Sequence, residues 1–288
     1  MPTLSDNFYG KSRVRLVKVV RDGDTHHLYE WNVNVFLTGD FEACFVEGDN
    51  TGLLATDTMK NTVYAVARNS TATTPEAFGI EYASFIAGRN PQITHVRVYI
   101  EEKIWIRIKA NGVHHGSAFL QRGPDVATAN IELPQTEGKP GTPTVTSGVK
   151  GLVILKTSQS AFAGFKRDEL TTLPETWDRL FGTEATITWV YNSPPADFGG
   201  TRTAIMDSLL TTFANHDSLS VQQTLYAMAG EVLATQPVVA EMTLTMPNRH
   251  NIPIDFSKNQ PPFNFEPNNS IFVPQDEPSG HIHARVVR

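Results

Sequence analysis

The chain has 288 residues, of which 40% are hydrophobic and 19% are charged, and its formal net charge at pH 7 is −6. This length suits two domains of ordinary size, and the composition is that of a globular protein. The negative net charge gives no electrostatic reason to bind a nucleic acid. The single cysteine, Cys44, excludes an intrachain disulfide, and its apolar neighbours predict a buried thiol.

We find no targeting signal in the sequence. Residues 1–6 lack a basic stretch followed by an apolar one, no apolar run is long enough to span a bilayer, and the last residues form no peroxisomal signal. We therefore expect a cytoplasmic protein without a membrane partner. The missing peroxisomal signal favours a bacterial source or a trimmed chain.

The first half contains two patterns of β-hairpins. Residues 14–20 are mostly apolar, Asp22-Gly23 is typical of a tight turn, and residues 31–37 then alternate between apolar and polar. The same alternation returns over residues 96–108 and leads into Asn111-Gly112, a second turn signal. These patterns predict antiparallel strands with one buried face.

Two helices are predicted between these hairpins. Thr56 resembles an N-cap residue, and Thr74-Pro75-Glu76 combines a cap, a proline in the first turn and an acid. The second helix would bury one face, made of Phe78, Tyr82, Phe85 and Ile86.

The second half repeats this order of strands, helices and strands. Residues 133–148 are rich in Pro, Gly and Thr, which predicts an irregular joint. We expect an α+β protein with two similar domains, residues 1–140 and 141–288, each an antiparallel sheet with helices on one face. Because such sheets leave open edges, we also expect an oligomer.

Four short segments hold polar residues in arrangements that packing does not require. Lys11 precedes the first strand, and Thr56-Asp57 stands at a predicted helix start whose free N–H groups suit an anion. Ser220 followed by Gln223 is a capping box, which places Val221 and Gln222 in the first helical turn. Asn248 and His250 lie together at the end of a predicted strand. Taken singly, each segment is as easily explained as a solvated side chain or a helix cap.

Other common site chemistries find no support in the sequence. The histidine pairs 26–27, 114–115 and 281–283 lack the spacing and the partners of a zinc site, so we expect no metal there. No Gly-rich loop follows a strand, and no Gly-x-Ser-x-Gly turn occurs.

Six segments in this order resemble the urate oxidase family. They run from Tyr9 to Lys11, Ala55 to Thr62, Phe162 to Asp168, Thr171 to Arg179, Ser220 to Gln222 and Pro247 to His250. The resemblance implies tandem tunnelling-fold domains and a homotetramer around a central tunnel. It also implies active sites at the subunit interfaces, with Thr56 and Asp57 supplied by the neighbouring subunit.

The resemblance implies a set of residues that bind urate and O2. Arg179 would hold the urate anion through parallel hydrogen bonds, Gln222 would pair with the opposite edge of the ring, and Phe162 would stack on its face. The backbone N–H groups of Val221 and Asp57 would complete the contacts. Asn248 and Thr56 would bind O2, peroxide or water above the ring.

The implied chemistry is the oxidation of urate by O2 to 5-hydroxyisourate and H2O2. Lys11, Thr56 and His250 match the family's proton relay, which would deprotonate urate until the ring itself can reduce O2. The resemblance therefore implies no cofactor and no metal.

Three positions depart from the family pattern. Leu170 stands where an aromatic residue is usual, Arg249 replaces a lysine, and Thr157-Ser158 inverts the usual order. None is an expected ligand, so we expect effects on packing or stability. Two alternatives remain, a tunnelling-fold enzyme that acts on a pterin or GTP, and an inactive purine-binding homologue. The first is disfavoured by Gln222 where such enzymes carry a glutamate, and the second by the presence of every relay residue.

Overall fold

The computed structural model describes residues 2–275 and 277–288 and confirms an α+β fold built on antiparallel strands. Contacts divide the chain into two compact units. The first comprises Met1–Lys150 and Trp189–Arg202, and the second comprises Gly151–Thr188 and Thr203–Arg288. None of the described helices is both long and apolar enough to cross a membrane.

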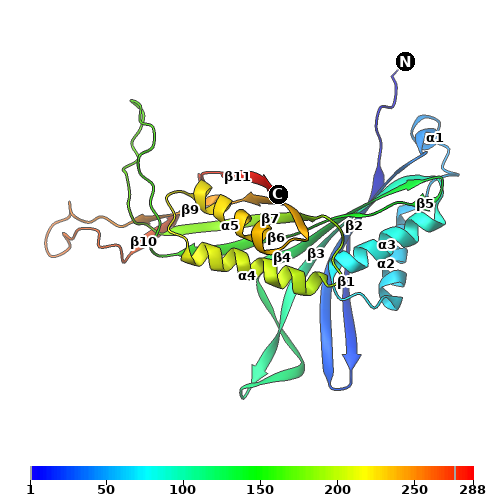
Figure 1. Cartoon of the computed structure of the whole chain (residues 1–288), viewed down its shortest axis with the longest axis horizontal. Helices are drawn as coiled ribbons and strands as arrows, with labels where there is room; N and C mark the ends of the chain where they lie inside the picture. The colour runs from blue at the N-terminus through cyan, green and yellow to red at the C-terminus, as the bar shows by residue number, and fades with distance from the viewer. Residues whose placement is uncertain (1, 276) are drawn as a thin grey trace. The chain divides into compact units, whose positions relative to one another are not determined.

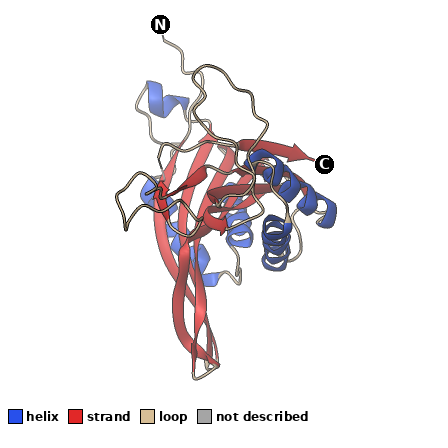
Figure 2. Cartoon of the chain, turned by 90° about the vertical axis from the view of Figure 1, so that its left-hand side faces the viewer, coloured by secondary structure: helices blue, strands red, loops and turns tan. Residues whose placement is uncertain are grey.

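In the first unit, consecutive strands pair in an antiparallel sheet of order β1-β2-β3-β4-β6. These are β1 (Tyr9–Asp22), β2 (Thr25–Gly39), β3 (Ile93–Ala110), β4 (Val113–Thr136) and the first part of β6 (Thr144–Lys156). Both predicted hairpins are confirmed, and their ends project beyond the helices (Figures 1 and 2).

Short helices complete the first unit. They are α1 (Glu42–Val46), α2 (Thr56–Asn69) and α3 (Pro75–Arg89), and α2 and α3 lie side by side (Figure 1). The core forms where α3 meets the sheet, since the Phe78 ring stacks on Trp31 with 4.8 Å between centroids. Thr74 caps α3 as predicted, because its hydroxyl accepts from the backbone N–H of Ala77.

Several local predictions in the first unit were wrong. The N-cap of α2 is Ala55, and Thr56 is already the first helical residue. Phe85 is 42% exposed, because it turns away from the face that buries Phe78. Cys44 is half-exposed, and its thiol donates to the Asn50 side chain.

The predicted irregular joint is instead largely a pair of strands. β4 continues to Thr136, a turn leads to the short β5 (Lys139–Pro140), and β6 begins at Thr144. Proline is tolerated there because β5 needs few ladder hydrogen bonds.

The second unit repeats the plan with a sheet of order β6-β7-β8-β11. Its main strands after β6 are most of β7 (Phe181–Tyr191), β8 (Val239–Thr245) and β11 (His283–Val287). Its helices are α4 (Phe198–Asn215) and α5 (Val221–Thr235), which lie side by side (Figure 1). The end of β7 and residues 198–202 of α4 belong to the first unit. Two short strands pair with each other, β9 (Asn248–Pro253) and β10 (Phe272–Gln275), and β9 also pairs with β7.

The core of the first unit encloses a charged pair. Glu102 is 5% exposed, accepts a hydrogen bond of 3.0 Å from Trp31 Nε1, and lies 3.2 Å from Arg202 Nη1. Burial raises the pKa of the Glu102 carboxyl, and the nearby Arg202 offsets only part of that rise. The folded chain therefore binds a proton at Glu102 more tightly than the unfolded chain does.

This pair makes stability depend on pH. A carboxyl whose folded pKa is raised stabilises the fold below its unfolded pKa of about 4.5, and that stability is lost as pH rises toward the folded pKa. We predict that Arg202→Met steepens this loss and costs about 3–5 kcal/mol at pH 8, but less at pH 5, where Glu102 can accept a proton. Urea unfolding at both pH values measures the difference.

The matched control is Arg285→Met, which removes a surface pair with Glu241 and should cost under about 1 kcal/mol at either pH. If Arg202→Met lowered the free energy of unfolding equally at pH 5 and pH 8, protonation of Glu102 would not contribute to the pH dependence of stability.

Candidate active site

In the first unit, the predicted lysine stands at a bend in the edge strand. Lys11 pairs with Val35, and the register then shifts through a β-bulge before Val14. Arg13 within the bulge has a φ of 59°, and its backbone N–H donates to the Asn34 side chain. Bulges redirect side chains beside functional sites, so this one sets the direction of half-buried Lys11.

The start of α2 offers backbone donors beside this strand. Because Ala55 is the N-cap, the N–H groups of Thr56, Asp57 and Thr58 have no acceptor within the helix. The Asp57 carboxylate faces Lys60 Nζ at 2.5 Å, which lowers the pKa of Asp57, and the charge of Lys11 lowers it further. Lys11 and Asp57 are thus close enough for their charges to interact.

In the second unit, the segment between β6 and β7 folds back onto the start of α5. Ala161 N–H donates to the carbonyl of Ser218 at 2.7 Å, and Ser218 N–H donates to that of Gln159 at 3.0 Å. Gln159 has a φ of 58°, a backbone conformation that is unfavourable for a residue other than glycine and that these bonds hold in place. The two hydrogen bonds to Ser218 hold the segment with Phe162 and Arg179 beside the helix that carries Gln222.

Phe162 and Arg179 form the aromatic and cationic part of this cluster. Arg179 N–H donates to the Ser160 carbonyl at 2.8 Å, and its guanidinium carbon lies 5.3 Å from the centre of the Phe162 ring. Burial lowers the pKa of the Arg179 guanidinium, with no offset from a carboxylate of the described residues. A half-buried cation without a counter-charge favours an anionic ligand.

The start of α5 presents the third part of the cluster. The Ser220 hydroxyl accepts from Gln223 N–H at 3.2 Å, which confirms the cap, while the Gln223 side chain accepts from Leu219 rather than from Ser220. Val221 is buried with its N–H in the first turn, whereas the Gln222 side chain is exposed. An exposed amide beside free N–H groups can bind a planar ring with alternating donors and acceptors.

Two hydroxyls that the sequence analysis did not single out support this helix start. Thr224 donates to Ser218 Oγ at 2.7 Å, and Ser218 in turn donates to the Ser220 carbonyl. Both residues are at most 2% exposed. No sequence signal marks them, because a serine and a threonine in a polar loop are ordinary until packing buries them.

Asn248 and His250 begin the short strand β9. Asn248 pairs with Thr183 of β7, its N–H donates to the Gly280 carbonyl at 2.8 Å, and His250 pairs with Gln275. His250 lines a pocket of about 140 Å³, together with Thr183 and other residues of β6, β7, β9 and β10. The predicted strand end is instead the beginning of a second strand.

The predicted residues therefore form local clusters in both units. Lys11, Thr56 and Asp57 belong to the first unit, and the second unit holds Phe162, Arg179, Val221, Gln222, Asn248 and His250. The binding and relay roles assigned to them remain predictions.

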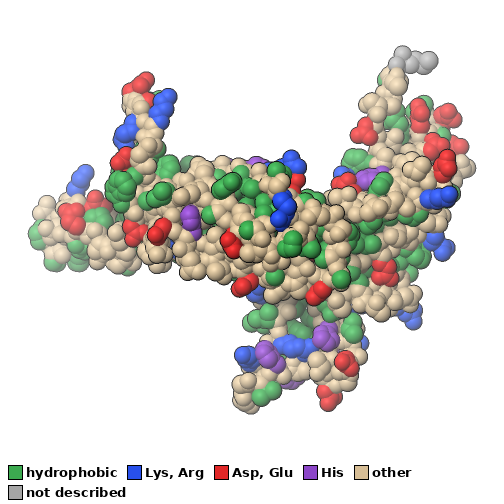
Figure 3. Space-filling model, viewed as in Figure 1, with side chains coloured by type: hydrophobic (Ala, Val, Ile, Leu, Met, Phe, Trp, Pro, Cys, Tyr) green, Lys and Arg blue, Asp and Glu red, His purple; other side chains and the backbone are tan. Residues whose placement is uncertain are grey.

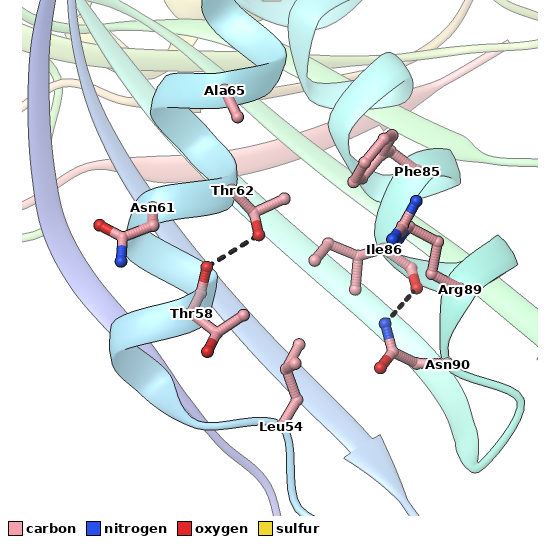
Figure 4. A pocket seen from close by; sticks show the side chains of 9 residues that line it. All are labelled: Leu54, Thr58, Asn61, Thr62, Ala65, Phe85, Ile86, Arg89 and Asn90. Carbon is pink, nitrogen blue, oxygen red and sulfur yellow. Dashed lines mark hydrogen bonds between the residues drawn. The ribbon is translucent and has the colours of Figure 1, made fainter.

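Two other features of the surface, a pocket and a group of charged side chains, do not include these predicted residues. A pocket of about 540 Å³ lies between α2 and α3, where Thr62 and Asn90 bond to their own helices (Figure 4). Histidine, lysine and arginine side chains gather on the projecting hairpins (Figure 3), yet the described residues include no metal-binding group of three or more His, Cys, Asp or Glu.

Comparison with known proteins adds an independent result. The Uricase family model matches residues 7–132 and 145–283. The chain is 38% identical over 285 residues to a uricase of Arthrobacter globiformis, covering 99% of this chain and 90% of that protein. It is 36% identical over 291 residues to a uricase of Dictyostelium discoideum, covering 100% and 98%.

The structural comparison agrees with the sequence comparison. The crystal structure of the Arthrobacter globiformis uricase superimposes with a TM-score of 0.91 at 37% identity, covering 100% of this chain and 96% of that one. This match confirms the expected tunnelling fold. The family model, the full-length identity and the shared fold together establish that the chain belongs to the uricase family.

Proposed function

We propose that the chain oxidises urate with O2 and water to 5-hydroxyisourate and H2O2, using side chains and backbone groups and no cofactor. Its family makes it an oxidoreductase, a urate oxidase. The proposal rests on one observation above all, the position of the Arg179 guanidinium over the Phe162 ring and beside the free start of α5. No carboxylate of the described residues offsets the charge of this guanidinium. That cluster offers a flat anionic ring a stacking face, a cation and an amide.

Urate binding follows from the chemistry of this cluster. The guanidinium donates two parallel hydrogen bonds to one edge of the anion, and the Gln222 amide both donates to and accepts from the opposite edge. Val221 N–H adds a donor, and the Phe162 face fixes the plane of the ring. The Asp57 N–H supplies a further donor.

The reaction itself needs proton removal before electrons can leave the ring. A deprotonated urate is electron-rich enough to reduce O2, and the two electrons and two protons leave as H2O2 while water adds to the ring. Lys11 accepts the urate proton, and Thr56 and His250 carry it onward. Asn248 and Thr56 hold O2 and then peroxide above the ring.

The division of these residues between two units is compatible with a site that a second copy of the chain completes. Lys11, Thr56 and Asp57 lie in one unit and the urate-binding cluster in the other. We propose a homotetramer in which one subunit supplies Thr56 and Asp57 to its neighbour's site. The open edge strand β1 and its exposed Val17 support this assembly, because exposed apolar strand edges tend to associate.

The first experiment follows urate absorbance, O2 uptake and H2O2 together with EDTA-treated protein. We expect one O2 consumed and one H2O2 formed for each urate, at the rate of untreated protein. A loss of activity restored by a metal would contradict the cofactor-free mechanism. No turnover in either sample would favour the inactive purine-binding homologue.

Arg179→Ala should lower kcat/KM for urate by about 10²–10³-fold, because the anion loses its charged hydrogen bonds in a half-buried site. The loss should appear mainly as weaker urate binding in steady-state kinetics. Arg167→Ala is the matched control, since Arg167 lies over the Phe165 ring in the same segment, with its guanidinium carbon 5.5 Å from the ring centre. Similar effects from both variants would refute a specific role for Arg179.

Lys11→Met should lower kcat by about 10²–10⁴-fold, the usual contribution of a positioned general base. A competitive urate analogue should still bind the variant with affinity near that of wild type, as measured by calorimetry. The control is Arg15→Met, which removes an exposed charge from the same strand. Unchanged turnover in Lys11→Met would rule out its place in the relay.

A further inference from the structure

Thr183 buries a hydroxyl that the proposed mechanism has not used. The residue is 0% exposed, and its Oγ1 has no hydrogen-bond partner among the described residues. Its neighbours on the same face of β7 are apolar, namely Phe181, Ala185 and Ile187. A buried unsatisfied hydroxyl is destabilising, and valine would fill this space without that penalty.

The register of β7 and β9 places this hydroxyl beside Asn248. Thr183 and Asn248 are direct cross-strand partners, so their side chains share one face of the sheet with Cβ atoms about 5 Å apart. The adjacent cross-strand pair, Gly182 and Arg249, lies on the opposite face of the sheet. On that face Arg249 Nη1 is 3.8 Å from Glu184 Oε2. Thr183 is therefore the residue of β7 that faces Asn248, and it lines the pocket that also contains His250.

We infer that Thr183 is a positioning residue, whose hydroxyl, unpaired among the described residues, donates to the side-chain carbonyl of Asn248 when O2 or peroxide binds the Asn248 NH2. The inference rests on the proposed role of Asn248 at the O2 site. An asparagine amide can rotate by half a turn at little cost, and only one orientation turns its NH2 toward the oxygen. A hydroxyl can donate to the amide carbonyl or accept from the amide NH2, so the oxygen bound at the NH2 selects the orientation, and Thr183 then stabilises it by donating to the carbonyl.

This arrangement explains why a hydroxyl is kept where an apolar residue would pack. The sheltered position excludes water from the hydroxyl, so the bond to Asn248 meets little competition and is stronger than the same bond in water. The bond then holds the Asn248 NH2 in place while O2 is converted to peroxide, so the amide dipole stays directed at the developing negative charge. The effect should therefore fall on the oxygen step and leave urate binding intact.

The test compares Thr183→Val, which keeps the shape and removes the hydroxyl, with Thr183→Ser, which keeps the hydroxyl. We expect Val to lower kcat and raise KM for O2, with a combined loss of about tenfold, and to leave KM for urate within about twofold. Ser should retain most of the wild-type activity. Thr186→Val, at an exposed position of the same strand, is the matched control.

A double-mutant cycle asks whether Thr183 acts through Asn248. In an Asn248→Ala background, Thr183→Val should cost little more, because the group it orients is already gone. Thermal unfolding should show that Thr183→Val is at least as stable as wild type. Should Val fail to fold, the comparison of Thr183→Ser with Thr183→Ala replaces it, and Ser should be the more active of the two.

Three results would overturn the inference. The first is a Thr183→Val enzyme with wild-type kcat and KM for O2, and the second is an equal loss in Val and Ser, which would assign the effect to packing. The third is an additive loss in the double variant, which would exclude action through Asn248. If the proposed function itself is wrong, neither wild type nor any variant will oxidise urate. Activity in wild type and in Thr186→Val therefore shows that the three outcomes concern Thr183 and not the proposed function.

Discussion

The candidate site depends on two backbone hydrogen bonds between the 157–180 segment and Ser218, which lies just ahead of the cap of α5. Ala161 and Gln159 bond to the carbonyl and the N–H of Ser218, at 2.7 and 3.0 Å. These bonds connect parts of the chain that lie about sixty residues apart in sequence, and they hold the segment that carries Phe162 and Arg179 beside an open helix start. Bonds within the segment, from Arg179 N–H to Ser160 and between Phe162 and Thr176, complete the arrangement.

The two units show how one structural plan serves two purposes. Helices α3 and α5 begin alike, with Thr74 and Ser220 capping the third helical N–H. The next two positions differ. Pro75 has no N–H to offer, and Glu76 is fully buried and accepts from Ser147 at 2.7 Å, whereas Val221 keeps its N–H and Gln222 is exposed. The first helix start therefore serves the core, and only the second is open to a ligand.

Both units bury polar side chains, but these buried groups differ in whether they have a partner among the described residues. Glu102 and Arg202 compensate each other within the first core, where their pairing ties strands to α4 and couples folding to pH. Thr183 in the second unit lacks such a partner and carries an energetic cost next to Asn248. A polar group that packing leaves uncompensated points to a use outside stability, and its position beside the expected oxygen site indicates which one.

The sequence by itself determined the hairpins, the capped starts of α3 and α5, and the family, because alternation, turn residues and caps act over a few neighbouring positions. It also nominated the site residues through six short segments in fixed order. Only the tertiary structure decided that Thr56 follows the cap, that residues 133–148 form strands, and that Thr183 faces Asn248. Those features depend on strand register and on burial between distant segments, which no local pattern specifies.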